Sequence, residues 1–326
     1  MIAVLGAFDG FHRGHAYLFE RAKEAAVFLG LEWGGVTFDS LPGLYMGTVE
    51  KALFTLRERE LIRLFLGIPK LVILKFDDEL AHLPPDRFWE YLRGQIVVDG
   101  IVVGRDFRFG YRRIGDVQLL EQYCRAAGVF FLPVDLLQHT GVKISSSAIR
   151  AAVEAGMCEP AARGLGYPYF MLAKVGHGSG RGRELGFPTA NLEVPGAKII
   201  PSDGVYAAAV LVNGTWRAGA LSIGKNPTFG DIADVRVEVF VLDYEGDLYD
   251  DSLLVFFLSR LRPQERFKDV SQLALQIEAD AKRARMTFKL KFEAHADDYL
   301  GFSAGYAKIM ARPNGDKQTE NGEFDR

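Results

Sequence analysis

The sequence predicts two domains: an N-terminal α/β domain built on a parallel sheet, and a C-terminal antiparallel β-barrel or sandwich followed by a helix. Three observations lead to this prediction. The chain has 326 residues, a length that suits two domains of ordinary size. Over the first 150 residues, short apolar runs alternate with amphipathic stretches. From residue 168 to residue 260, apolar runs are separated by Gly, Pro and Asn turns, with no helical pattern between them.

The elements of the N-terminal domain follow from hydrophobic periodicity. Apolar runs of strand length predict strands at residues 2–5, 33–38, 70–76, 96–103 and 129–134. Apolar residues at helical spacing predict helices at residues 17–29, 55–66, 85–93, 117–127 and 145–156. This alternation predicts a parallel sheet covered on both faces, with ligands bound beyond the carboxyl ends of its strands.

The C-terminal domain shows a different pattern. Apolar runs predict strands at residues 170–175, 205–212, 216–223, 236–243 and 253–258. The pair Asn213-Gly214 between two of these runs is typical of a two-residue hairpin turn. A helix is predicted at residues 270–285, where apolar residues return to helical spacing.

These patterns place the domain boundaries. We expect the first domain at 1–157, a linker at 158–167, the second domain at 168–285 and a tail at 286–326. The tail is expected to be helical at first. From Arg312 onward it is rich in polar residues, Gly and Pro that cannot bury a core, so we expect disorder there.

Composition excludes several classes of protein. The net charge of −3 argues against a broadly basic nucleic-acid-binding protein. The chain has two cysteines, Cys124 and Cys158, which are too few for a disulfide framework. They are also too far apart in the sequence to form the CxxC pair of a zinc site. No apolar run of about 18 residues predicts a membrane span. The chain starts without the basic region of a signal peptide, so a cytoplasmic location is expected, with no nucleic-acid or membrane partner.

The segment GAFDGFHRGH, residues 6–15, joins the first predicted strand to the first predicted helix. Gly6 and Gly10 permit a close approach of the backbone to a ligand. His12 and His15 flank the helix start, where unpaired N–H groups and the helix dipole favour an anion. From composition alone, a plain turn with two surface histidines is an equally good interpretation.

Three strings in this domain resemble one family. The HxGH element resembles the signature of the nucleotidyltransferase superfamily, and the fuller string resembles the FMN adenylyltransferase domain of bacterial bifunctional riboflavin kinase/FAD synthetases. VGRDFRFGYRRIGD, residues 103–116, resembles that family's VGxDFRFGxxRxGD element. KISSSAIR, residues 143–150, resembles its VSSTxIR element. The resemblance implies a Rossmann-like nucleotidyltransferase fold.

The resemblance also implies roles for individual residues. His12 and His15 are expected to bind the ATP phosphates and to be the catalytic residues of adenylyl transfer. The implied nucleotide and flavin contacts are Gly6, Phe8, Asp9, Asp106, Phe107, Phe109, Ser145, Ser146, Ser147 and Arg150. The two aromatic residues of this set, Phe107 and Phe109, are equally compatible with a place in the core. The implied reaction is a direct attack of the FMN phosphate on the α-phosphorus of ATP, with Mg²⁺ expected to be bound mainly by phosphates.

The sequence departs from this family's usual TFxPHP string after the second strand. Ser40 stands where Pro is usual, and Leu41 stands where His is usual. Loss of the histidine is expected to weaken triphosphate binding or flavin placement. Ser147, where the family has Thr, keeps the hydroxyl group.

A second motif, GSGRGRELGFPTANL, covers residues 178–192. The motif contains a flexible, positively charged stretch that suits a phosphate-binding loop: Gly180, Arg181, Gly182 and Arg183. A solvated turn has the same composition. Further along, Thr189 and Asn191 are two residues apart. On a strand, both side chains point to one face, where a hydroxyl and an amide oxygen suit a single cation.

This motif resembles the riboflavin kinase signature GxGRGxxLGFPTANL. Further matches to riboflavin kinase strings lie at residues 201–207, 222–230, 236–249 and 261–277. The resemblance implies a barrel of riboflavin-kinase type in which Thr189 and Asn191 contact the metal and the ATP phosphates. Glu238 matches the catalytic base that takes the proton from the ribityl 5′-hydroxyl. Arg262 matches a position near the flavin, and Phe240 replaces a usual histidine.

The leading interpretation is a bifunctional enzyme that phosphorylates riboflavin to FMN with ATP and then adenylylates FMN to FAD, releasing pyrophosphate. The expected partners are therefore the small molecules riboflavin, FMN and ATP. The alternative, prompted by Leu41, is a riboflavin kinase whose first domain only binds flavin or nucleotide. A nucleotidyltransferase for another small phosphate substrate is the third class, and the kinase strings argue against it.

Overall fold

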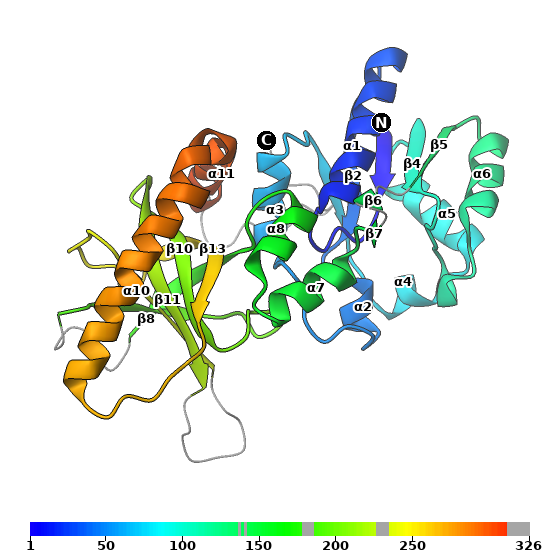
Figure 1. Cartoon of the computed structure of the whole chain (residues 1–326). Helices are drawn as coiled ribbons and strands as arrows, with labels where there is room; N and C mark the ends of the chain where they lie inside the picture. Colours follow the sequence, from blue (N-terminus) through cyan, green and yellow to red (C-terminus); the bar gives the residue numbers. More distant parts are fainter. Residues whose placement is uncertain (136–137, 140–141, 178–185, 226–234, 312–326) are drawn as a thin grey trace. The chain divides into compact units, whose positions relative to one another are not determined.

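The computed structural model describes residues 1–135, 138–139, 142–177, 186–225 and 235–311 (Figure 1). The chain divides into two compact units. The first is Met1–Ser146, joined by the end of the chain from Lys308 on, and the second is Ser147–Ala307. The division lies within the helix predicted at residues 145–156.

The first unit is built on a five-stranded parallel sheet with the order β3-β2-β1-β4-β5. Its strands are β1 (Ile2–Leu5), β2 (Trp33–Phe38), β3 (Leu71–Leu74), β4 (Gly100–Gly104) and β5 (Phe130–Val134). Every residue of β1, β3 and β4 is buried, which explains their continuous apolar sequence. The predicted parallel sheet is confirmed.

The strand predicted at residues 96–103 begins only at Gly100. Val97 is 78% exposed, and its carbonyl accepts a hydrogen bond from the amino group of Met1 at 2.9 Å. The carboxylate of Asp99 pairs with the same amino group. The chain before Gly100 is therefore held outside the sheet by polar contacts that an apolar pattern does not show.

Helices cover both faces of this sheet. The helical elements of this unit are α1 (Arg13–Leu29), α2 (Pro42–Tyr45), α3 (Leu56–Phe65), α4 (Asp78–His82), α5 (Pro85–Gln95), the 3-10 turn η1 (Tyr111–Arg113) and α6 (Val117–Ala126). On one face, Phe88 and Leu92 of α5 and Leu120 of α6 join the core beneath the strands. On the other, α1 packs closely, because a Cβ at Gly35 would lie 2.9 Å from the Phe19 ring. A short hairpin, β6 (Gln138–His139) and β7 (Val142–Lys143), precedes the second unit.

The second unit is a closed antiparallel barrel with the strand order β10-β11-β12-β9-β8-β13. Its strands are β8 (Phe170–Gly176), β9 (Thr189–Glu193), β10 (Gly204–Val212), β11 (Thr215–Lys225), β12 (Val235–Val241) and β13 (Ser252–Arg262). All of β10 is buried, because α10 (Val270–Lys291) packs on its outer face. Asn213 and Gly214 form the predicted hairpin turn, with φ angles of 49° and 76°. Both the barrel and this turn confirm the sequence prediction.

Two segments outside the predicted second domain pack in this unit. The predicted linker at 158–167 contains a helix, α8 (Cys158–Leu165), which follows α7 (Ser146–Glu154). Cys158, Ala161 and Leu165 bury one side of α8. Glu159 on this helix accepts a hydrogen bond from Ser259 of β13 at 2.8 Å. Three small or apolar residues within an eight-residue segment are too few to distinguish a helix from a loop in the sequence.

The predicted tail also contributes to the core. α10 continues to Lys291, six residues beyond the predicted end at 285, and is followed by η2 (Glu293–Tyr299) and α11 (Leu300–Met310). Phe292 and Phe302 are fully buried and both contact Phe256 of the barrel, with ring centroids 5.8 Å and 5.0 Å apart. The disorder predicted from Arg312 onward lies outside the described residues. Within the part of the chain that the structure describes, no helix is both long enough and apolar enough to cross a membrane.

Candidate active sites

The loop between β1 and α1 has a strained backbone that aromatic packing holds in place. Phe8 and Phe11 have φ angles of 46° and 39°, an uncommon conformation for aromatic residues. Both rings are fully buried and stack with centroids 5.2 Å apart. Gly6 makes room for them, because a Cβ there would lie 2.5 Å from the Phe8 ring. The Phe8 ring packs in the interior and shapes the loop, and a contact of this residue with the nucleotide stays a prediction.

His12 and His15 lie together at the first turn of α1, as the sequence predicts. His12 is the N-cap, and its Nδ1 accepts a hydrogen bond from the backbone N–H of His15 at 3.3 Å. The two rings stack with centroids 3.7 Å apart. Burial, together with the nearby His12 ring, lowers the pKa of His15 well below 6.5, so this imidazole is neutral at pH 7. Two imidazoles at a helix N-terminus are placed to meet a phosphate.

Asp9 has a supporting position in the same loop. Its side chain is buried, and Oδ1 accepts a hydrogen bond from the backbone N–H of Leu53 at 2.9 Å. Leu53 lies just before Thr55, whose side chain caps α3 in a capping box with Glu58. This hydrogen bond ties the loop to the start of α3, and the ligand contact of Asp9 stays a prediction.

The residues after β4 divide between an exposed edge and the core. Asp106 is exposed at the carboxyl end of β4, beside β1, where the order of the strands reverses. Ligands of open α/β sheets bind at such a point. Phe109 is 5% exposed and packs against Phe88 at 5.7 Å, so it belongs to the core rather than to a flavin site. Phe107 is half-buried and stacks on Phe109 at 5.9 Å.

The serine string and Arg150 do not fall within one compact unit. Ser145 and Ser146 end the first unit, whereas Ser147 and Arg150 belong to the second. All but Ser145 lie in α7, with Ser146 at its first position. The predicted helix start is confirmed, and a role of these residues at the nucleotide stays a prediction.

In the barrel, the predicted kinase residues share one face of two paired strands. Thr189 and Asn191 are partly exposed and alternate with buried residues along β9, so their side chains point to the same side. Glu238 on β12 lies directly opposite Asn191 in the antiparallel register. The Thr189 hydroxyl donates a hydrogen bond to Oε2 of Glu238 at 3.4 Å. The structure thus brings a carboxylate, a hydroxyl and an amide together, as the sequence motifs predict.

Two further polar residues belong to this face and were not identified from the sequence. Ser222 on β11 lies opposite Glu238, on the side away from Asn191. Its hydroxyl accepts a hydrogen bond from Nε2 of Gln264 at 2.7 Å. Both residues occur in matched strings, but only strand pairing shows that Ser222 lies beside Glu238, and only the hydrogen bond to Ser222 places Gln264 next to it. Phe240 on the same strand packs edge-on against Phe187 at 5.6 Å, so it fills space where a histidine is usual.

The composition of the barrel face bears on the predicted Mg²⁺. Within the described residues, no three His, Cys, Asp or Glu side chains cluster as a metal site requires. Thr189, Asn191 and Glu238 instead offer oxygen atoms of the kind that Mg²⁺ accepts beside substrate phosphates. The donor set therefore fits a cation held jointly with ATP. The loop residues Gly180, Arg181, Gly182 and Arg183, predicted to bind phosphate, lie outside the described residues.

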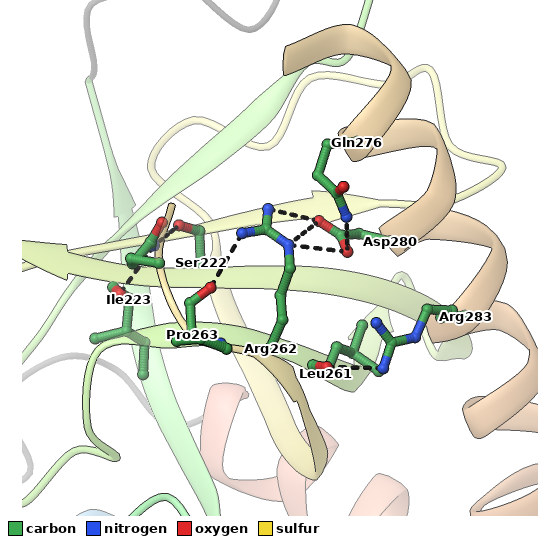
Figure 2. A network of polar contacts seen from close by, with 9 residues as sticks. Ser222, Ile223, Leu261, Arg262, Pro263, Gln276, Asp280 and Arg283 are labelled. Atoms are coloured by element: carbon green, nitrogen blue, oxygen red, sulfur yellow. Dashed lines mark hydrogen bonds and ion pairs between the residues drawn. The ribbon is translucent and has the colours of Figure 1, made fainter. Parts of the chain in front are cut away.

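Arg262, predicted to lie near the flavin, is held by an ion pair in the structure (Figure 2). Its Nε and one terminal nitrogen donate to Oδ2 of Asp280 on α10 at 2.9 Å and 2.8 Å. The two side chains are 11% and 4% exposed. Gln276 donates to the same carboxylate at 3.0 Å, and Arg262 also donates to the Pro263 carbonyl at 3.1 Å. Arg262 thus joins the end of β13 to α10, and its predicted place near the flavin stays a prediction.

Asp280→Asn is expected to lower the free energy of unfolding of the barrel by about 3–5 kcal/mol, because the Arg262 charge stays buried without its counter-charge. Chemical denaturation followed by circular dichroism measures this change. The matched control is Asp243→Asn, which breaks the exposed pair with Arg285. We expect that control to cost less than about 1 kcal/mol. Equal effects of the two substitutions would contradict the anchoring role.

Comparison with known proteins matches both halves of the chain. The FAD synthetase family model matches residues 1–148, and the riboflavin kinase model matches residues 165–288. The bifunctional riboflavin kinase/FMN adenylyltransferase of Listeria monocytogenes is 34% identical over 291 residues, covering 88% of this chain and 92% of the relative. The Bacillus subtilis protein of the same description is 34% identical over 289 residues, covering 87% and 91%. The chain belongs to this family.

A solved structure shares the fold of this family member. The crystal structure described as a macrolide-efflux protein from Streptococcus pneumoniae has a TM-score of 0.79 and 32% sequence identity, and the match covers 87% of this chain and 93% of the other. The predicted family and the predicted fold, a parallel α/β domain followed by a barrel and a helix, are therefore confirmed.

The departure at Leu41 has a structural explanation in this member of the family. The side chain is 6% exposed, so it packs inside the protein rather than facing a ligand. Its carbonyl accepts hydrogen bonds from the backbone N–H groups of Leu44 and Tyr45 at 2.9 Å and 3.1 Å and starts α2. Leu41 thus has a packing role at the start of α2, and the match of both family models supports the bifunctional interpretation over the degenerate one.

Proposed function

We propose that the chain carries out its two reactions at two separate sites: riboflavin phosphorylation on the barrel face and FMN adenylylation at the carboxyl edge of the parallel sheet. As a member of a bifunctional family with both catalytic domains, the protein is a riboflavin kinase and an FMN adenylyltransferase that uses ATP. The observation that supports the division most strongly is the grouping of Glu238, Thr189 and Asn191 within one unit, apart from the histidine pair of the other.

In the kinase reaction, Glu238 is the general base. Its carboxylate takes the proton of the ribityl 5′-hydroxyl as that oxygen forms a bond to the γ-phosphorus of ATP, and the bond to the ADP oxygen breaks. The hydrogen bond from Thr189 fixes the orientation of the carboxylate. Thr189 and Asn191 present the oxygen atoms that hold Mg²⁺ beside the ATP phosphates. Bound there, the cation neutralises phosphate charge.

In the adenylylation reaction, a phosphate oxygen of FMN forms a bond to the α-phosphorus of ATP, and pyrophosphate leaves with the bridging oxygen. His12 and His15 receive the growing charge of that leaving group at the N-terminus of α1. Among the described residues, Nδ1 of His15 is buried without a hydrogen-bond partner, which is unusual enough to call for a functional reason. The protein supplies alignment and charge neutralisation and forms no covalent bond.

The remaining expectations extend this proposal. We assign the adenylyltransferase site to residues 1–157 and the kinase site to residues 168–285, while the segments on either side of the second range pack on the barrel. The protein acts on small molecules in the cytoplasm and binds neither nucleic acid nor membrane, in keeping with the net charge of −3.

Incubation of the purified full-length protein with riboflavin, ATP and Mg²⁺ tests the proposed function. Chromatography of the flavins is expected to show FMN first and FAD later. Accumulation of FMN without FAD would contradict the adenylyltransferase activity. FAD formed from supplied FMN, but no FMN formed from riboflavin, would contradict the kinase activity. Omission of Mg²⁺ is expected to stop both steps.

A further inference from the structure

Arg59 is a fully charged side chain placed in the interior of the first unit. It lies in the first half of α3 and is 2% exposed. In the sequence it belongs to the run Arg-Glu-Arg-Glu at residues 57–60, which is typical of a solvated helix face. A buried guanidinium is costly unless its hydrogen bonds are satisfied, so its partners indicate what it does.

The partners of Arg59 lie at the carboxyl ends of β1 and β2. One terminal nitrogen donates to the carbonyl oxygen of Ala7 at 3.4 Å and to the Thr37 hydroxyl oxygen at 3.3 Å. The other donates to the carbonyl oxygens of Phe38 and Asp39, each at 2.9 Å. The Thr37 hydroxyl donates in turn to the Ala7 carbonyl at 3.0 Å. The planar fork of one arginine therefore joins the chain after β1 to the chain after β2.

Both terminal nitrogens of Arg59 thus have acceptors, whereas its Nε is buried without a hydrogen-bond partner among the described residues. Two carboxylates act on the guanidinium through their charge. Asp9 and Asp39 favour the charged form of Arg59, although burial lowers its pKa to about 10, so the guanidinium stays charged at pH 7. Asp9 holds the N–H of Leu53, and Asp39 holds the N–H of Phe76 at 2.9 Å. Four chain segments at the ligand-binding edge of the sheet thus depend on Arg59 and on two carboxylates, of which Asp9 is buried and Asp39 is half-buried.

The contact with Ala7 matters because of the loop that follows. Residues 6–12 include the strained Phe8 and Phe11 and end at His12, the N-cap of α1. A strained loop keeps its conformation only where its surroundings fix it. Arg59 fixes the start of this loop, and the stacked aromatic rings fix its middle.

We propose that Arg59 is a positioning residue for adenylyl transfer, which holds the loop of residues 6–12 against the end of β2 so that His12 and His15 meet the leaving pyrophosphate. The proposal rests on the proposed function of the histidine pair. Lysine at this position keeps the positive charge but lacks the planar fork that reaches four acceptors at once.

The same helix offers a matched control. Arg63, one turn further along α3, donates to both carboxylate oxygens of Glu60 at 2.7 Å and to the Pro69 carbonyl at 3.2 Å. These two side chains are 11% and 4% exposed. Arg63→Lys therefore removes a comparable bidentate contact of α3, but one remote from the ends of β1 and β2.

The first test compares Arg59→Lys with Arg63→Lys in the full-length enzyme. Arg59→Lys is expected to lower kcat for FAD formation from FMN about 10- to 100-fold, with the KM for ATP changed less than about threefold and FMN formation from riboflavin unchanged. Arg63→Lys is expected to leave both activities unchanged. A wild-type kcat in Arg59→Lys, or an equal loss in both variants, would overturn the proposal.

The second test does not depend on turnover. NMR titration of the imidazole protons reports the pKa of His15 in the wild-type protein and in both variants. Loss of the Arg59 fork is expected to admit water around His15 and to raise its low pKa toward 6.5, whereas Arg63→Lys leaves it unchanged. An unchanged pKa of His15 in Arg59→Lys would overturn the proposal about Arg59, whatever the activity of the enzyme. Failure of the wild-type enzyme to form FAD would contradict the proposed function instead.

Discussion

Glu238→Gln is expected to lower the rate of FMN formation from riboflavin about 100- to 10,000-fold and to leave FAD formation from supplied FMN intact. Glutamine keeps the size of the side chain and accepts the hydrogen bond from Thr189, so the barrel face retains its geometry. It cannot take the proton of the ribityl hydroxyl. Initial rates measured separately with riboflavin and with FMN, each with ATP and Mg²⁺, give the two effects.

Glu193→Gln is the matched control for this substitution. Glu193 ends β9 and points to the same side of the strand as Thr189 and Asn191, but it is exposed and two residues further along. We expect this control to keep both activities. A kinase rate in Glu238→Gln close to that of the wild type would remove Glu238 from the mechanism. Loss of both activities would contradict two independent sites.

The contrast between Glu238 and Arg59 shows what the sequence can and cannot predict. Glutamate on a strand is usually exposed, and only the flanking strings single out Glu238. Strand pairing then adds Ser222, which no pattern within its own strand distinguishes. The charged sequence around Arg59 is typical of an exposed helix face. Its burial cannot be predicted from that sequence, because the carbonyl groups that it binds follow strands distant in the chain.

The same reasoning explains which parts of the fold were predictable. Strands buried on both sides, such as Leu71–Leu74, read as continuous apolar runs, so the parallel sheet follows from the sequence. Phe292 and Phe302 are spaced too irregularly to indicate a core, yet both pack on Phe256 of the barrel. Contacts between elements far apart in the chain, rather than local periodicity, decide whether such a segment is a tail or part of the domain.

Arg262 shows the limit of transferring a role from a matched string. The string containing it is similar to that of riboflavin kinases, but its guanidinium makes a bidentate contact with Asp280 and is nearly buried. An arginine whose charge is neutralised in this way supports the site by fixing α10 to β13.

His15→Ala is expected to lower the rate of FAD formation about 100- to 1,000-fold, while FMN formation from riboflavin continues at the wild-type rate. The imidazole lies at the start of α1, stacked on His12, and it is the group placed to receive charge from the departing pyrophosphate. Alanine is compatible with the helix, so α1 is retained. Rates with FMN and with riboflavin, measured on the same preparation, separate the two activities.

His82→Ala provides the control for His15→Ala, because His82 lies on α4 of the same unit, where its ring packs against Tyr111. We expect that variant to retain both activities. The buried Nδ1 of His15 adds a second criterion, since the Ala variant removes an unpaired polar atom from the interior and is not expected to destabilise the first unit. A fall in FAD formation with no loss of thermal stability therefore indicates catalysis. A kinase defect as large as the adenylyltransferase defect would contradict the assignment of the histidine pair to one reaction.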